Sequence, residues 1–162
     1  MGFYQFHTTQ IIPSDLSTVW EFISSPGNLK KITPEHMGFD ITSPHLPERI
    51  YPGLIISYRL SLFPGLKTTW VTEITHVKKN AYFVDEQREG PYAIWHHEHH
   101  LKEVKEGVLM TDLVSYKPPL GVLGSIANHF FIRRKLQKIF SYRTIALENL
   151  FGKLNKAESK EG

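Results

Sequence analysis

Hydrophobic and polar residues alternate along much of the chain up to Lys117, and helical spacing dominates beyond it. Residues 3–12 are rich in aromatic and β-branched side chains, which predicts a strand. Ser14 is then the expected N-cap of a short helix with Asp15 in its first turn. The apolar residues of this helix recur at helical spacing: Leu16, Val19, Trp20 and Ile23. Residues 28–32 predict one further helical turn.

Short strand-like runs follow one another over the next part of the chain. They lie at residues 39–42, 54–63, 67–77, 81–88, 92–104 and 108–117. The segments between them, such as Pro52-Gly53, Pro64-Gly65 and Glu106-Gly107, are typical of turns. Strands this close together predict antiparallel neighbours, because a parallel crossover needs roughly a dozen residues or more.

The last third of the chain predicts one long helix. Residues 125–151 contain neither Pro nor Gly, and at 1.5 Å per residue they would form a helix about 40 Å long. Its apolar stripe is Ile126, Phe130, Leu136, Ile139, Phe140, Leu147 and Leu150. The order of strand, two short helices, six strands and long helix predicts an α+β fold, in which a curved antiparallel sheet covers the helix. We expect one domain over residues 1–152 and a polar tail over residues 153–162.

Composition narrows the possible functions. A net charge of +3 without a clustered basic face does not predict nucleic-acid binding. The absence of cysteine excludes disulfides, thiolate catalysis and cysteine-bound metals. The N-terminus lacks the pattern of a signal peptide, and no run approaches the roughly 20 apolar residues of a membrane span. These features predict a soluble, cytoplasmic protein.

The strand over residues 92–104 carries the most unusual pattern in the chain. Alternation places Trp95, His97, His99 and Leu101 on one face. The other face is polar throughout and carries His96, Glu98, His100 and Lys102. Because the face with apolar ends is the one that burial favours, we expect His97 and His99 to point inward.

Three interpretations of His97 and His99 remain open. They are core histidines satisfied by polar neighbours, polar groups of a ligand pocket, or metal ligands completed by Asp85 or Asp112. Nothing in the spacing requires a metal, so we predict neither a metal nor another cofactor, and we favour the pocket.

The neighbouring strands supply the other candidate pocket residues. Asp112 lies on an otherwise apolar face of residues 108–117 and needs a partner, for which an inward histidine is the natural candidate. Such pairing would raise the pKa of the histidine and lower that of the aspartate. The candidate ligand-binding residues are Trp70, Thr72, Phe83, Asp85, Gln87, Trp95, His97, His99, Asp112 and Tyr116.

Several sequence strings resemble those of the START-like, or SRPBCC, helix-grip superfamily, which includes the birch-pollen allergen. They are residues 83–87 with Gly90-Pro91, then residues 95–99, 111–116, 119–124, 133–134 and 140–143. Residues 19–22 and Pro52-Gly53 also fit. More narrowly, the chain is similar to the bacterial ligand-binding branch described as polyketide cyclase/dehydrase-like. The resemblance implies a seven-stranded antiparallel sheet gripping the C-terminal helix, with a cavity between them, and its members bind lipids, sterols, polyketides, quinones or hormones.

Three functional hypotheses follow. The leading one is binding or carriage of a small apolar or amphipathic molecule, such as a lipid, polyketide or quinone, between the sheet and the C-terminal helix. The alternative is a cyclase or dehydratase in which His97 or His99, tuned by Asp112, moves a proton. A third uses the surface of the last helix against an acidic partner or membrane headgroups, through Arg133, Arg134, Lys135, Lys138 and Arg143.

The expected partners follow from the same patterns. We expect a small-molecule ligand rather than nucleic acid, membrane contact that is at most peripheral, and a monomer or homodimer. The segment over residues 117–124 is a candidate pocket gate or lipid contact, or simply a connector.

Overall fold

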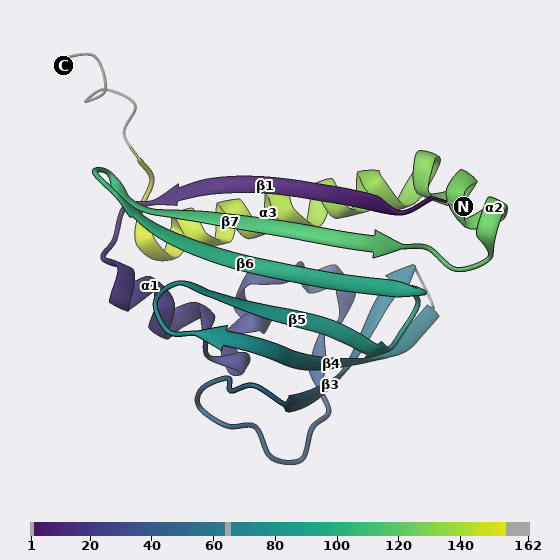
Figure 1. Ribbon diagram of the computed structural model, residues 1–162, viewed down its shortest axis with the longest axis horizontal. Coiled ribbons are helices and arrows are strands. Elements are labelled where there is room, and N and C mark those ends of the chain that lie inside the picture. The colour runs from purple at the N-terminus through teal and green to yellow at the C-terminus, as the bar shows by residue number, and fades with distance from the viewer. Residues whose placement is uncertain (1, 64–65, 155–162) are drawn as a thin grey trace.

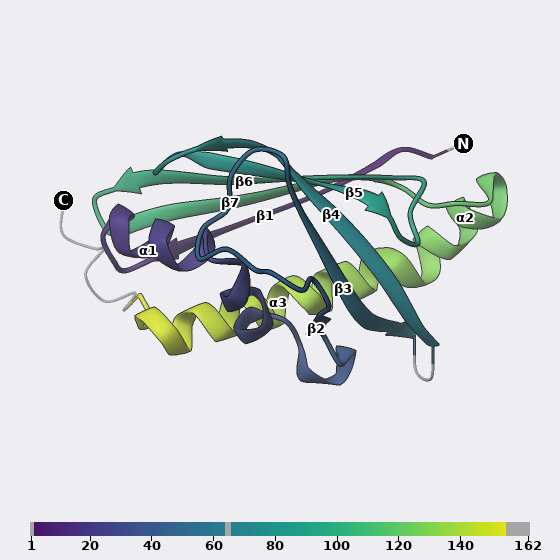
Figure 2. The same ribbon diagram turned by 90° about the horizontal axis from the view of Figure 1, so that it is seen from below.

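The computed structural model describes residues 2–63 and 66–154. The predicted turn at Pro64-Gly65 and most of the predicted tail lie outside the described residues. One sheet of seven strands has the order β1-β7-β6-β5-β4-β3-β2, and every neighbouring pair is antiparallel. Figures 1 and 2 show a long C-terminal helix lying across the concave side of this sheet. The predicted α+β helix-grip arrangement is confirmed.

The elements follow the predicted order. The strands are β1 (Tyr4–Ile12), β2 (Asp40–Ile41), β3 (Leu54–Phe63), β4 (Leu66–Lys78), β5 (Tyr82–Glu89), β6 (Ile94–Val104) and β7 (Gly107–Lys117). Between β1 and β2 lie helix α1 (Leu16–Ile23) and the 3₁₀ turns η1 (Pro26–Ile32) and η2 (Glu35–Met37). After β7 come helix α2 (Gly121–Ala127), the π-helical turn η3 (Asn128–Ile132) and helix α3 (Arg133–Phe151).

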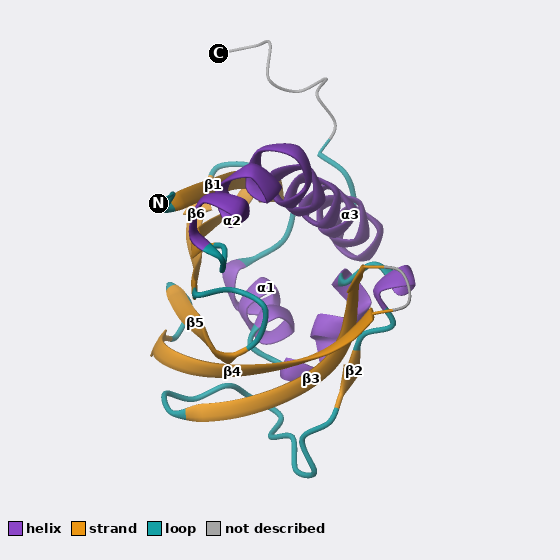
Figure 3. Cartoon of the chain, turned by 90° about the vertical axis from the view of Figure 1, so that its right-hand side faces the viewer, coloured by secondary structure: helices purple, strands orange, loops and turns teal. Residues whose placement is uncertain are grey.

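The sheet bends around the helix at irregularities in β4. Its pairing with β5 shifts register between Val71 and Thr72 and again between Ile74 and His76. Such bulges bend a strand and increase its twist. Figure 3, viewed toward the α2 end, shows β3, β4 and β5 curving away from β1, with α3 on the concave side of the sheet.

The start of α1 differs from the prediction. Its N-cap is Asp15, not Ser14, because the extended backbone of Asp15 lets its side chain accept a hydrogen bond from the Thr18 amide at 2.8 Å. The amide of Ser14 instead bonds to the Ile12 carbonyl in the preceding turn.

The C-terminal helix begins at Gly121, earlier than predicted, and its apolar stripe is only partly buried. Leu136, Phe140 and Leu147 are buried against the sheet, as predicted. In contrast, Ile126, Phe130 and Leu150 are exposed, so both ends of the predicted apolar stripe lie outside the core. No helix in the described part of the chain is long and apolar enough to cross a membrane.

Candidate functional site

A cavity of about 210 Å³ lies between the inner face of the sheet and the helices. Strand alternation supplies its apolar floor, because residues two apart on β3 and β4 point to the same side. These inward residues are Ile56, Tyr58 and Leu60 on β3 and Trp70, Thr72 and Ile74 on β4. Helix α3 closes the cavity with Leu136, Ile139, Phe140 and Arg143.

One wall of this cavity is polar. Asp85 on β5 pairs with His97 on β6, and His99 on β6 pairs with Asp112 on β7. The two histidines therefore share one face of a central strand with a carboxylate on either side. His97, His99 and Asp112 are all buried, which confirms the predicted inward register of the two histidines.

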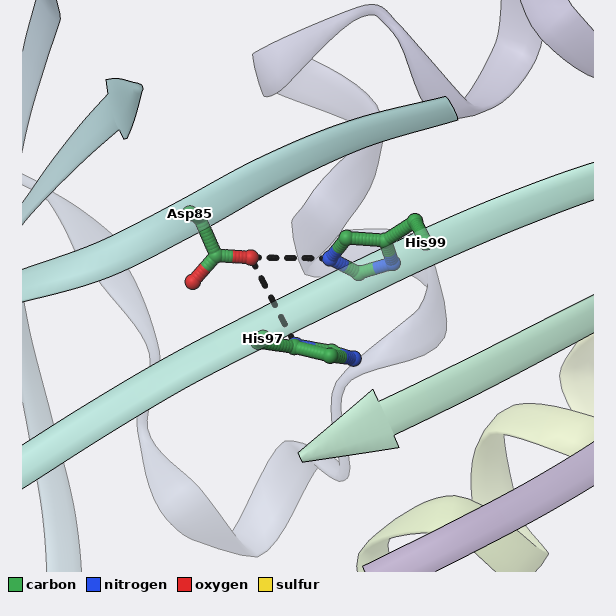
Figure 4. A group of neighbouring side chains, drawn as sticks. All are labelled: Asp85, His97 and His99. Atoms are coloured by element: carbon green, nitrogen blue, oxygen red, sulfur yellow. Dashed lines mark hydrogen bonds and ion pairs between the residues drawn. The ribbon is translucent and has the colours of Figure 1, made fainter. Parts of the chain in front are cut away.

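Each imidazole lies between the two carboxylates. Oδ2 of Asp85 is 2.8 Å from Nε2 of His99 and 3.4 Å from Nδ1 of His97 (Figure 4). On the opposite side, Oδ1 of Asp112 is 3.0 Å from Nε2 of His97 and 2.9 Å from Nδ1 of His99. The predicted pairing of Asp112 with an inward histidine is confirmed, and it involves both histidines.

Arg143 joins this cluster from α3. Its Nη1 lies 3.3 Å from Oδ1 of Asp112 and its Nη2 lies 3.4 Å from Nδ1 of His99. Arg143 is 8% exposed, so the hypothesis that it contributes to a solvent-facing basic surface is wrong. The two carboxylates carry two negative charges and Arg143 carries one positive charge. Protonation of one imidazole would therefore make the cluster neutral.

Of the two imidazoles, His99 is the one that its surroundings favour in the protonated form. Burial disfavours a charge there, but hydrogen bonds to Asp112 and Asp85 outweigh burial and raise the pKa of His99. The Phe83 ring stacks on the His99 ring with 4.1 Å between the ring centroids. The face of an aromatic ring attracts a cation, so this contact also favours a protonated His99. His99 is therefore the imidazole of the pair whose protonated form the cluster favours, with Nε2 donating to Asp85.

His97 has the opposite tendency. Burial and then the positive charge of His99 lower the pKa of His97, because the ring centroids are only 3.7 Å apart. Pairing with the aspartates raises the pKa of both histidines, as expected from the sequence, but at His97 burial and the charge of His99 outweigh this effect. For Asp112, burial is outweighed by the charge of Arg143 and the histidine bonds, which hold its pKa well below the ordinary value, as predicted.

Asp85, His97 and His99 could also offer three ligand atoms to a metal ion, since these atoms lie within 4.8 Å of one another. Within the cluster, Nε2 of His97 is already hydrogen-bonded to Asp112 and Nε2 of His99 to Asp85. Arg143 adds a fixed positive charge beside them. The charge balance thus favours a bound proton over a bound metal.

Two tyrosines also line the cavity. Burial and the negative charge of Asp85 raise the pKa of Tyr58, which keeps its hydroxyl neutral. Burial likewise raises the pKa of Tyr92, whose ring packs against Trp70 and Trp95. Both tyrosines line the cavity and both were missed from the sequence.

The candidate residues from the sequence divide into two groups. Those that line the cavity are Trp70, Thr72, Phe83, Asp85, Trp95, His97 and His99. The remaining three lie behind its lining. Gln87 exchanges two hydrogen bonds with the backbone of Tyr92, Asp112 supports the histidines from the far side, and the Tyr116 hydroxyl donates to Asn128 at 2.7 Å.

Sequence signals existed for two of the missed residues. Tyr58 continues the alternation of Leu54 and Ile56 on β3, which places it on the inner face. Arg143 follows Phe140 by three residues and precedes Leu147 by four, so it lies on the buried stripe of α3. Because this helix contains several other basic residues, the hypothesis of a basic helix surface groups Arg143 with them.

Comparison with known proteins identifies the fold. No protein-family model matches the sequence, and no curated protein sequence matches it. The structure is similar to TTHA0849 from Thermus thermophilus, with a TM-score of 0.69 and 15% identity over 90% of this chain and 95% of that one. It is also similar to CV1439 from Chromobacterium violaceum, with a TM-score of 0.70 and 10% identity over 93% and 99% of the two chains.

A plant protein shares the same architecture. Major latex-like protein 151 from Panax ginseng gives a TM-score of 0.68 at 16% identity, covering 92% of this chain and 97% of that one. Identities this low establish the fold and leave the ligand open. The chain therefore has the helix-grip fold, with a buried cluster of two histidines, two aspartates and an arginine beside its cavity.

Proposed function

We propose that this protein binds and carries a small, mainly apolar molecule that bears one hydrogen-bond donor. The observation that carries the proposal is a mainly apolar cavity with one wall formed by the ion-paired residues Asp85, His97 and His99. Ligand pockets typically combine apolar walls with a few placed polar groups. Many helix-grip proteins that the sequence resembles bind such molecules, and the cytoplasm remains the location we propose.

The volume of the cavity limits the size of the ligand. At about 210 Å³ it is larger than an apolar cavity of roughly 150 Å³ that admits benzene. A bicyclic molecule of about ten to twelve non-hydrogen atoms is a suitable size by this comparison. We therefore propose a compact ring compound rather than a long-chain lipid.

Asp85 defines the polar end of the ligand. Its Oδ2 accepts from His99, while its other oxygen points away from both histidine rings (Figure 4). Burial raises the pKa of Asp85, but the hydrogen bond and charge of His99 and the charge of Arg143 help to lower it overall, so this oxygen belongs to a carboxylate. A hydroxyl or N–H group of the ligand would donate to it, with the Tyr58 hydroxyl nearby.

Binding of 2-naphthol and naphthalene to the purified protein tests this proposal, with cavity tryptophan fluorescence as the signal. We expect 2-naphthol to bind about tenfold more tightly, since a hydrogen bond to a charged group contributes about 1.5–3 kcal/mol. Asp85→Asn should remove most of this preference. Ile139→Trp, which fills the cavity, should abolish binding of both compounds, whereas Ile145→Trp on the exposed side of α3 should not. Failure of both compounds to bind the wild type would refute the proposal.

A second candidate function is enzymatic proton transfer. Its supporting observation is that neighbouring histidines have opposite pKa shifts, which separates a neutral base, His97, from a charged acid, His99. Such a pair suits removal of a proton next to a carbonyl group. Deuterium exchange at C1 of 2-tetralone, followed by proton NMR, tests this function. Exchange that is accelerated by the wild type and lost in His97→Gln supports catalysis, and equal exchange rates exclude it for this compound.

A further inference from the structure

The beginning of the C-terminal helix exposes an unusual number of large apolar side chains. We call this group the α2 tip, and it consists of Leu120, Val122, Leu123, Ile126, Phe130 and Phe131. Leu120 is 77% exposed, Leu123 67% and Phe131 65%. Contiguous exposed apolar patches commonly mark surfaces that contact a partner or a membrane.

Internal packing fixes which side of the helix faces outward. The inward positions are Gly124, Asn128, Ile132 and Leu136, spaced four residues apart. A regular α-helix would rotate such positions by about 40° per step, and the wider π turn over η3 compensates for this drift. Asn128 is held inward by the Tyr116 hydroxyl. Phe130 and Phe131 therefore face solvent as a consequence of the fold.

Two further exposed residues lie beside the α2 tip. Tyr4 pairs with Tyr116 at the end of β7, and Ile94 pairs with Lys117. Phe3 and Ile94, which are 57% and 45% exposed, therefore lie at the strand end from which α2 departs. Figures 1 and 2 show α2 at one end of the molecule, next to the start of β1.

The chain segment that contains the α2 tip carries charge of one sign. No Asp or Glu occurs between Asp112 and Glu148. In the first turns after the tip, Arg133, Arg134 and Lys138 are exposed. An apolar helix face flanked by cations is the pattern of helices that lie in the interface of an anionic bilayer.

We propose that the α2 tip docks this protein on anionic membrane surfaces. Its apolar side chains enter the boundary between headgroups and acyl chains, and the neighbouring cations lie against lipid phosphates. The contact is peripheral, because no helix among the described residues could span the bilayer. This inference is independent of what the cavity holds.

Vesicle flotation tests the proposal with the full chain. The probes are vesicles of phosphatidylcholine alone and of equal parts phosphatidylcholine and phosphatidylglycerol. We expect binding to the anionic vesicles only, weakening as salt is added. Leu123→Gln/Phe131→Gln should lower the affinity about 100-fold through lost apolar burial. Arg133→Gln/Arg134→Gln should lower it about 25-fold, since each cation near the surface contributes about a factor of five.

The matched control is Ile55→Gln/Ile145→Gln, which replaces two exposed apolar residues outside the tip and should leave binding unchanged. All substituted residues are exposed, and thermal unfolding of each variant checks that the fold is retained. Absence of wild-type binding to anionic vesicles, or equal binding by the Leu123→Gln/Phe131→Gln variant, would overturn the proposal. A different outcome is that the wild type does not bind vesicles but self-associates in light scattering, and that this variant does not self-associate. That result would instead assign the tip to contact with a second copy of the chain.

Discussion

Asp112 should be the most sensitive position for stability in the buried cluster. Its Oδ1 contacts Nε2 of His97 at 3.0 Å, Nδ1 of His99 at 2.9 Å and Nη1 of Arg143 at 3.3 Å. Asp112→Asn preserves the shape of the side chain and removes the negative charge. Arg143 and His99 would then share Asp85 alone, and the buried cluster would carry an excess positive charge.

Removing one member of a buried ion pair costs about 3–5 kcal/mol in the free energy of unfolding. With a urea dependence of about 2 kcal/mol per molar, the unfolding midpoint at pH 7 should fall by roughly 1.5–2.5 M. Tryptophan fluorescence can follow unfolding, since Trp70 and Trp95 lie beside the cluster in the cavity wall. Asp40→Asn is the control, because Asp40 and its partner Lys30 are both exposed, and it should change stability by less than about 1 kcal/mol.

The pH dependence provides a second check on the same variant. The folded-state pKa of Asp112 is depressed, so its contribution is complete above the unfolded pKa near 3.9 and is lost as the pH falls toward the folded pKa. The stability gap between wild type and Asp112→Asn should therefore be largest at neutral pH and shrink below about pH 4. A gap under about 1 kcal/mol at pH 7, or one that grows with acid, would refute the charge assignment.

Three further outcomes follow from the structure. Long-range proton–nitrogen NMR at neutral pH should find His99 protonated on both ring nitrogens and His97 neutral, and the reverse assignment would contradict the proton's placement. Gly124→Ala should cost about 1–3 kcal/mol in urea unfolding, because its Cβ would lie 1.9 Å from a proline carbonyl oxygen, whereas Gly27→Ala meets nothing closer than 4.0 Å and serves as control. Asp15→Ala should lower the free energy of unfolding by about 1 kcal/mol through loss of the α1 cap, and an unchanged urea midpoint would assign the cap no role.

The sequence predicts the inner faces of the strands well, because alternation is a local property. Alternation along the strand separates His97 and His99 from His96 and His100, and the same rule places Asp112 inside. It does not determine which residues of neighbouring strands lie close to one another. That both aspartates contact both histidines depends on the register of β5, β6 and β7, which long-range pairing sets.

Arg143 shows a second limit of prediction from sequence. A basic residue on a helix rich in Lys and Arg is usually solvent-exposed, and only its spacing from Phe140 and Leu147 indicates burial. Burial of its charge is favourable here because Asp112 lies opposite. The partner is on a different element, so the helix sequence alone could not reveal it.

The apolar residues of the C-terminal helix are buried in one part of the helix and exposed in another. Leu136 and Phe140 are buried because the curved sheet covers α3, whereas Phe130 and Phe131 are exposed, and β7, the last strand among the described residues, ends at Lys117. Burying those side chains would require the helix to rotate, which would break the Tyr116–Asn128 hydrogen bond. The fold therefore keeps an apolar surface in water at a free-energy cost that a bilayer would remove, and this is the physical reason to expect the α2 tip to act at a membrane.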